Sequence, residues 1–146
     1  QSMVAVGVRK VEMEEVFEQS DIISIHAPEL PSTYHIVNEA SIASMKDGVI
    51  LINTARGTAI DEQALAKALL SGKIKTACLD VYDPEPPCAD NPLLKLDNCI
   101  MTPHIAGQAA NGLQRIGYNC YCQLLHFLAG ERMQGEITRD MLNHIA

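Results

Sequence analysis

Several familiar sequence features are missing from this chain of 146 residues, and each absence narrows what it can be. No apolar run approaches the roughly 18 residues that a membrane-spanning helix needs, so we expect no membrane segment. Lysine and arginine form no cluster and the net charge is −7, which argues against a nucleic-acid partner. No signal-peptide pattern is present. No Gly-x-Gly-x-x-Gly segment occurs either, so the usual glycine-rich cradle for a bound phosphate is missing.

The cysteines also lack a pattern. Their number is odd and no spacing is typical of a metal site: Cys78, Cys88, Cys99, Cys120 and Cys122. Cys120 and Cys122 are two positions apart on a predicted helix, so their side chains point to different sides and cannot share a metal ion. We therefore expect five reduced cysteines, no metal centre and a cytoplasmic protein.

Regular secondary structure is well signalled. Four short runs of mostly apolar, β-branched residues predict strands at Ile22–Ile25, Val49–Ile52, Thr76–Leu79 and Cys99–Met101. Their apolar residues follow one another without alternating, as in parallel strands buried on both faces. Helical segments fall between the runs, so we expect an α/β fold in which helices connect the parallel strands.

The helices are predicted from caps and periodicity. Three short ones are expected over Glu12–Gln19, Glu39–Met45 and Asp61–Leu70, the last with Asp61 as N-cap and Gly72 as terminator. One helical turn is expected near Asn91–Leu94, and a short helix over Arg139–Ile145. The longest helix is expected over Ala109–Ala129, with an apolar stripe formed by Leu113, Ile116, Cys120, Leu124 and Phe127.

Polar residues follow every predicted strand. These segments are His26-Ala27-Pro28, Asn53-Thr54-Ala55-Arg56-Gly57, Asp80 with Glu85, and Thr102-Pro103-His104. In an open parallel sheet the ligand binds beyond the carboxyl ends of the strands. The sequence therefore predicts that these side chains share one edge of the sheet and form its functional site.

His104 is the candidate general acid and base, because histidine exchanges a proton near neutral pH. Glu85 is its candidate partner, since a carboxylate beside the imidazole stabilises the charged ring and fixes its tautomer. Each has a plainer interpretation. His104 would then be a hydrogen-bonded residue at a strand end, and Glu85 a solvated acid of a proline-rich loop.

Arg56 is the candidate anchor for a substrate carboxylate, since its planar guanidinium can bind one with two hydrogen bonds. Gly57 would let backbone or ligand approach closely. The plainer interpretation of Arg56 is a surface ion pair with Asp61 or Glu62. Asp80 ends a buried strand, where an acid needs partners. It could accept hydrogen bonds from a carboxamide, or it could cap the following loop.

Four blocks of sequence carry a family resemblance: Ser20–Pro28, Met45–Gly57, Leu79–Pro86 and Thr102–Gly107. In this order and spacing the chain, from about Gly7 to Gly130, resembles the NAD-dependent D-isomer-specific 2-hydroxyacid dehydrogenases. The resemblance implies hydride transfer between NAD and C2 of a 2-hydroxy or 2-keto acid; NADP is not excluded.

The resemblance also implies roles for individual residues. Arg56, Glu85 and His104 would be catalytic, and Asp80 would hold the nicotinamide carboxamide. The remaining cofactor contacts would come from Ala27, Pro28, Thr54, Ala55, His104 and Gly107.

The departures from the family concern what is missing. A family member has about 300 residues, with a substrate domain built mostly from its N-terminal part and a glycine-rich turn that opens the cofactor domain. We expect an incomplete Rossmann-type sheet over residues 1–107 and a helix with tail over 108–146. Such a fragment would be inactive alone, and would form a homodimer or pair with the missing half. A non-catalytic nucleotide-sensing or scaffolding relative is the alternative.

Overall fold

The computed structural model describes residues 7–108, 112–133 and 135–143, and its main elements follow the predicted order. They are α1 (Met13–Gln19), β1 (Ile22–Ile25), α2 (Glu39–Ser44), β2 (Val49–Asn53), α3 (Glu62–Ser71), β3 (Ile74–Leu79), β4 (Cys99–Met101) and α4 (Gly112–Leu128). The predicted α/β fold is confirmed, and each of the four strands lies where it was expected.

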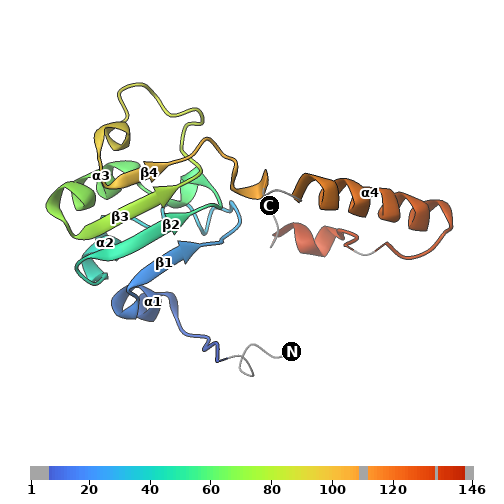
Figure 1. The fold of residues 1–146 in the computed structure, drawn as a ribbon. Coiled ribbons are helices and arrows are strands. Elements are labelled where there is room, and N and C mark those ends of the chain that lie inside the picture. The colour runs from blue at the N-terminus through green and yellow to red at the C-terminus, as the bar shows by residue number, and fades with distance from the viewer. Residues whose placement is uncertain (1–6, 109–111, 134, 144–146) are drawn as a thin grey trace.

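The four strands form one parallel sheet in the order β1-β2-β3-β4. Its register aligns Ile25 with Asn53, Asn53 with Leu79, and Leu79 with Met101. All four carboxyl ends therefore meet at one edge, on the side from which α4 departs (Figure 1). This alignment brings together the loops that carry the candidate site.

Burial on both faces is the prediction that the structure corrects. Ile23, Leu51 and Ala77 point into a core shared with α1, α2 and α3, where they are almost fully buried. On the other face Ile22 is 59% exposed and Ile100 56% exposed. The described helices cover only one face of the sheet, so β1 alternates between exposed and buried side chains, and in β4 the exposed Ile100 lies between two half-buried residues. The continuous apolar runs reflect a second face that no described element covers.

The helix ends follow the predicted chemistry. The Asp61 side chain accepts hydrogen bonds from the backbone of Gln63 and Ala64, and Gly72 ends α3 in a left-handed conformation with φ 77°. Asn38, which the sequence analysis did not single out, forms a capping box at α2. The turn expected near Asn91–Leu94 is a 3₁₀ helix, Pro92–Lys95.

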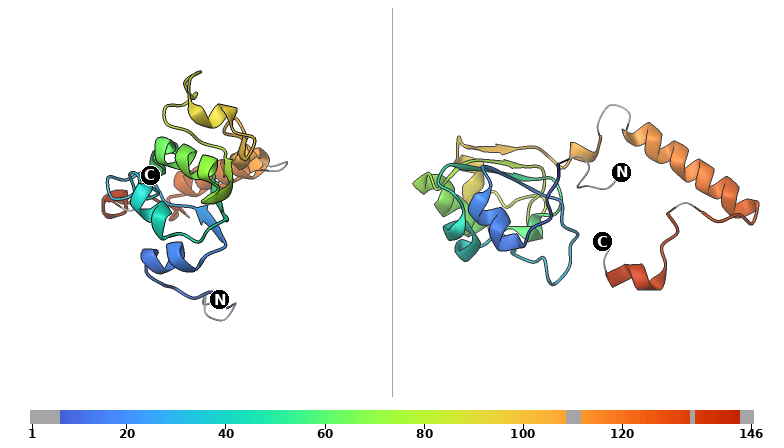
Figure 2. Two further views of the ribbon diagram at one scale, coloured as in Figure 1. Left: turned by 90° about the vertical axis from the view of Figure 1, so that its left-hand side faces the viewer. Right: turned by 90° about the horizontal axis from the view of Figure 1, so that it is seen from below.

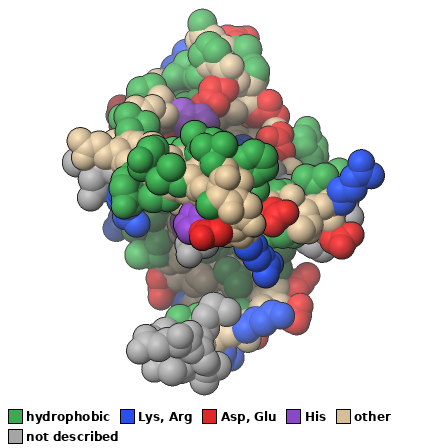
Figure 3. Space-filling model, turned by 90° about the vertical axis from the view of Figure 1, so that its right-hand side faces the viewer, with side chains coloured by type: hydrophobic (Ala, Val, Ile, Leu, Met, Phe, Trp, Pro, Cys, Tyr) green, Lys and Arg blue, Asp and Glu red, His purple; other side chains and the backbone are tan. Residues whose placement is uncertain are grey.

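Helix α4 lies apart from the sheet in Figure 1 and in the right-hand view of Figure 2. None of its described residues is buried. Its predicted stripe is therefore exposed, with Leu113 at 65% and Phe127 at 64%. On this side of the molecule hydrophobic side chains form much of the visible surface (Figure 3). The predicted start at Ala109 falls outside the described residues.

The remaining expectations concern the tail, the cysteines and metals. A 3₁₀ helix, Arg139–Asn143, occupies most of the predicted tail helix, whose last two residues lie outside the described part. All five cysteines are unpaired. Within residues 7–108, 112–133 and 135–143, no cluster of three potential metal ligands occurs. No helix in those ranges has the length and apolar character needed to cross a membrane.

Candidate active site

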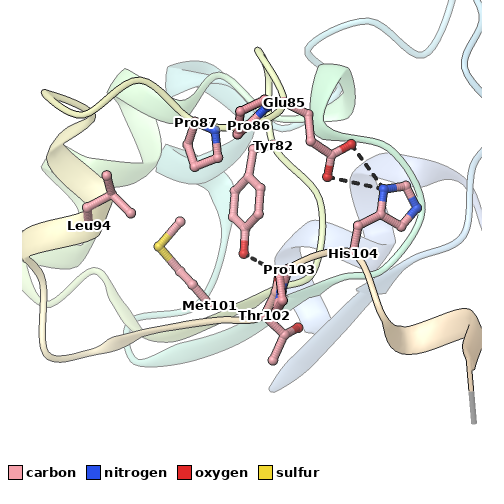
Figure 4. A pocket seen from close by; sticks show the side chains of 9 residues that line it. All are labelled: Tyr82, Glu85, Pro86, Pro87, Leu94, Met101, Thr102, Pro103 and His104. Carbon is pink, nitrogen blue, oxygen red and sulfur yellow. Dashed lines mark hydrogen bonds and ion pairs between the residues drawn. The ribbon is translucent and has the colours of Figure 1, made fainter.

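Glu85 and His104 lie side by side, although 18 residues separate them in the sequence. His104 Nδ1 is 3.1 and 3.0 Å from the two carboxylate oxygens of Glu85 (Figure 4). With Nδ1 engaged, Nε2 is the ring nitrogen that stays available for another partner. The pair is open to solvent, with 51% of the His104 side chain and 38% of Glu85 exposed. It is thus placed to exchange a proton with a bound molecule.

The backbone at His104 is unusual. Its φ is 52°, in the left-handed region that residues other than glycine seldom adopt. Glu85 follows β3 in a loop in which both the Asp83–Pro84 and the Glu85–Pro86 peptide bonds are cis. Two irregular loops, one after β3 and one after β4, therefore present the histidine–glutamate pair.

Arg56 projects from a turn that the buried end of β2 shapes. Asn53 is fully buried; its amide nitrogen donates to Arg56 O at 2.8 Å and its amide oxygen accepts from Ala55 N at 3.0 Å. The guanidinium itself is half exposed. Its Nη1 donates to Ala55 O at 2.8 Å, and its Nε lies 3.8 Å from a carboxylate oxygen of Glu29. The surface ion pair considered from the sequence thus involves Glu29 rather than Asp61 or Glu62.

Gly57 brings the Arg56 turn against the loop that carries Glu85. A Cβ atom at this position would lie 2.0 Å from both the carbonyl carbon and the oxygen of Tyr82. The close approach expected at Gly57 is therefore made by backbone. Within the described part of the chain, Arg56 forms no hydrogen bond or ion pair with Glu85 or His104; it shares the edge of the sheet with them.

Asp80 is buried at the end of β3 and is fully engaged with the segment around His104. Its carboxylate accepts hydrogen bonds from the Thr102 hydroxyl and from the backbone of Ile105 and Ala106. Burial alone would raise the pKa of this carboxyl group, but the three hydrogen bonds outweigh it and hold the pKa below its usual value of 3.8. Asp80 therefore stays ionised at neutral pH.

An apolar pocket of about 450 Å³ lies on the Glu85 side of the pair (Figure 4). Its nine lining residues are Tyr82, Glu85, Pro86, Pro87, Leu94, Met101, Thr102, Pro103 and His104. Most of this lining offers water no hydrogen-bond partner. The histidine–glutamate pair thus has an apolar surface on one side, and His104 Nε2 faces away from Glu85.

The other predicted cofactor residues also lie at the carboxyl edge. Ala27 and Pro28 follow β1 and are half buried, while Thr54 and Ala55 follow β2. Gly107 lies beyond β4, exposed, in the 3₁₀ helix Ala106–Gln108. The edge thus gathers every residue that the sequence analysis selected for the site.

Two residues that shape the site lie in the predicted edge segments but were given no role of their own there. Asn53 builds the Arg56 turn, and Thr102 links Asp80 to the strand that leads to His104. A signal for Asn53 did exist, because a side-chain amide at the end of an apolar strand needs hydrogen-bond partners when buried. For Thr102 the decisive fact is the partner across the sheet, which the sequence does not show.

Comparison with known proteins identifies the family. Residues 1–106 match the family model described as the NAD-binding domain of D-isomer specific 2-hydroxyacid dehydrogenases. The chain belongs to this family. Hydroxypyruvate reductase of Thermotoga maritima is 49% identical over 112 residues, and D-3-phosphoglycerate dehydrogenase of Archaeoglobus fulgidus is 44% identical over 112 residues. These matches cover 75% and 77% of this chain.

The fold comparison agrees. Holo D-mandelate dehydrogenase of Rhodotorula graminis matches with a TM-score of 0.82 and 33% identity over 93% of this chain. The matched region is 41% of that structure, and 37% and 21% of the two relatives above. This chain therefore spans well under half of each of these relatives and corresponds to their NAD-binding part.

The residues at the edge fit the nicotinamide end of NAD. A carboxylate offers about four acceptor positions. Oδ1 of Asp80 already accepts from Thr102 and Ile105, while Oδ2 accepts only from Ala106. One acceptor position on Oδ2 is left for an amide donor such as the nicotinamide carboxamide. The chain has no glycine-rich loop for the phosphates, so this fit concerns the nicotinamide end.

Proposed function

We propose that this chain supplies the proton-transfer pair and the nicotinamide side of a D-2-hydroxyacid dehydrogenase. The observation that carries the proposal is the contact of His104 Nδ1 with both oxygens of Glu85, which leaves Nε2 open at the carboxyl edge of the sheet. Arg56 supplies an anion-binding group on the same edge. The substrate class is a small 2-hydroxy or 2-keto acid.

When bound, NAD would supply the hydride acceptor for oxidation of the hydroxy acid at C2, and NADH the hydride donor for the reverse reduction. His104 Nε2 accepts the hydroxyl proton during oxidation and donates it to the carbonyl oxygen during reduction. The Glu85 carboxylate stabilises the imidazolium form between the two steps. Arg56 binds the substrate carboxylate, and Asp80 orients the carboxamide.

The test is a panel of 2-keto acids, including hydroxypyruvate and glyoxylate, with NADH and NADPH and the complete gene product. We expect His104→Ala and Arg56→Ala to lower kcat/KM for the best substrate by about a hundredfold or more. His126→Ala is the matched control, because His126 also contacts a glutamate, at 2.7 Å, but lies on α4 away from the edge. Near-normal rates in His104→Ala would refute the assignment.

The proposal also includes the domain organisation of the chain and its association with a partner. We infer two domains, residues 1–107 for the cofactor and 108–146 for the helix and tail, with the exposed stripe of α4 covered by a second copy or by the remaining half of the enzyme. Five unpaired cysteines favour a cytoplasmic setting.

The alternative is a nucleotide-sensing or scaffolding relative without turnover. The same panel separates the two functions when calorimetry of NADH binding is added. Binding without reduction of any keto acid would support the alternative, whereas reduction that depends on His104 would exclude it.

A further inference from the structure

The conformation of His104 needs support, because a left-handed backbone at a non-glycine residue persists only where its surroundings hold it. Its own backbone N–H donates to Thr102 O at 3.0 Å. The next two backbone N–H groups, of Ile105 and Ala106, donate to the Asp80 carboxylate at 2.9 and 2.8 Å. Hydrogen bonds thus hold the turn on both sides of the histidine.

Thr102 contributes to the hydrogen bonds that hold the turn on both sides of His104. Its carbonyl oxygen accepts from His104 N and also from the Tyr82 hydroxyl, at 2.6 Å. Its hydroxyl donates to Asp80 Oδ1 at 2.5 Å. Burial raises the pKa of Tyr82 above 10, so its phenol stays a donor at any working pH. Thr102 therefore joins the buried tyrosine, the buried aspartate and the backbone of His104.

We propose that Thr102 is the positioning residue of the site, and that its hydroxyl and carbonyl, through Asp80 and Tyr82, hold His104 in the turn that faces its imidazole toward Glu85. Its meaning for catalysis rests on the function proposed above. Thr102 touches neither substrate nor cofactor in this scheme; it acts through the backbone on each side of His104.

The hydroxyl of Thr102 has a specific consequence. Without it, Asp80 Oδ1 keeps only the donor from Ile105, and the carboxylate can rotate in its pocket. The turn then loses its fixed orientation and His104 spends less time against Glu85. Because the contact with Glu85 favours the imidazole form that carries its proton on Nδ1, a looser pair is expected to populate this form less.

The first experiment follows the ring-nitrogen signals of His104 in this chain by NMR, which report how much of the imidazole carries its proton on Nδ1, in the wild type and three variants. We expect Thr102→Val to lower the share of the Nδ1-protonated form, and Thr102→Ser, which keeps a hydroxyl, to restore it. Thr76→Val is the matched control on β3, remote from the carboxyl edge. An unchanged share of this form in folded Thr102→Val would overturn the proposal.

The second experiment measures kinetics in the complete gene product. We expect Thr102→Val to lower kcat about tenfold with little change in KM, and to change the kcat–pH profile. Thr102→Ser should recover both. Loss of kcat with an unchanged profile in both variants would mean a merely structural residue and would contradict the positioning role.

Tyr82→Phe keeps the proposal testable if Thr102→Val does not fold. This change keeps the buried ring and removes the hydroxyl, which donates to Thr102 O and also lies 3.0 Å from Leu79 O, so we expect a smaller change of the His104 ring-nitrogen signals in the same direction. No change in Tyr82→Phe would then count against the role of Thr102. The NMR readout does not need turnover, so failure of the dehydrogenase assignment and failure of the positioning role give different results.

Discussion

At the scale of single residues, Gly57 is the position of the site where an added side chain would be tolerated least. An added methyl group would overlap the backbone of Tyr82, so the Arg56 turn and the Glu85 loop would have to separate. We expect Gly57→Ala to lower the free energy of unfolding by about 1–3 kcal/mol, the usual range for overpacking, in urea titrations. Gly117→Ala is the control, because nothing lies near its Cβ position in α4. Equal stability of the two variants would contradict the close approach.

Asp80 gives a residue-scale prediction for acid stability. Its pKa is lower in the folded chain than in the unfolded one, where 3.8 is the ordinary value. Such a carboxyl group stabilises the fold above the unfolded pKa, and this contribution is lost as the pH falls through the folded pKa. We expect the free energy of unfolding to decline below about pH 4, and to decline less steeply in Asp80→Asn.

Asp47 is an exposed carboxylate against which the acid stability of Asp80→Asn can be compared. The hydrogen bond and the charge of Lys73 lower the pKa of Asp47, but its carboxylate is exposed to solvent. High salt should therefore cancel the effect of Asp47→Asn on the acid decline and leave that of Asp80→Asn in place. A decline that is the same in the wild type and in Asp80→Asn would show that the buried carboxylate contributes nothing to it.

At the scale of elements, α3 and α4 differ in how deeply their apolar side chains are buried. Leu65 of α3 is fully buried in the core, whereas Leu124 of α4 is 54% exposed. We expect Leu65→Ala to lower the free energy of unfolding by about 2–5 kcal/mol and Leu124→Glu to change it by less than about 0.5 kcal/mol. Urea unfolding monitored by circular dichroism measures both. A large loss in Leu124→Glu at low protein concentration would mean that α4 packs on its own chain.

At the scale of the whole molecule, the open sheet face and the stripe of α4 are more apolar surface than a monomer usually shows. We expect light scattering to find species larger than the 15.9 kDa chain, increasing with concentration. Leu124→Glu combined with Phe127→Glu should shift them toward the monomer. A single 15.9 kDa species at every concentration would contradict this, and denaturing mass spectrometry of the preparation would detect any second polypeptide.

Secondary structure followed from local chemistry. The β-branched runs at β1–β4, the Asp61 cap and the Gly72 terminator act within a few residues, so their effect is visible in the sequence. The candidate site was partly visible for a related reason, since polar residues directly after buried strands must gather at one edge of a parallel sheet. The prediction that both faces of the sheet are buried was wrong, because burial of a face depends on what packs against the sheet.

The sequence by itself determined the α/β order of elements, the family and the residues that line the carboxyl edge. Only the tertiary structure decided which of them touch. The parallel register sets Glu85 against His104, places Asp80 beneath Ile105 and Ala106, and leaves Arg56 beside Glu29. Such contacts join residues far apart in the chain, and a hydrogen bond forms only where both partners arrive within about 3 Å. Strand alignment and packing bring the partners to this distance, and no short stretch of the sequence indicates that they will.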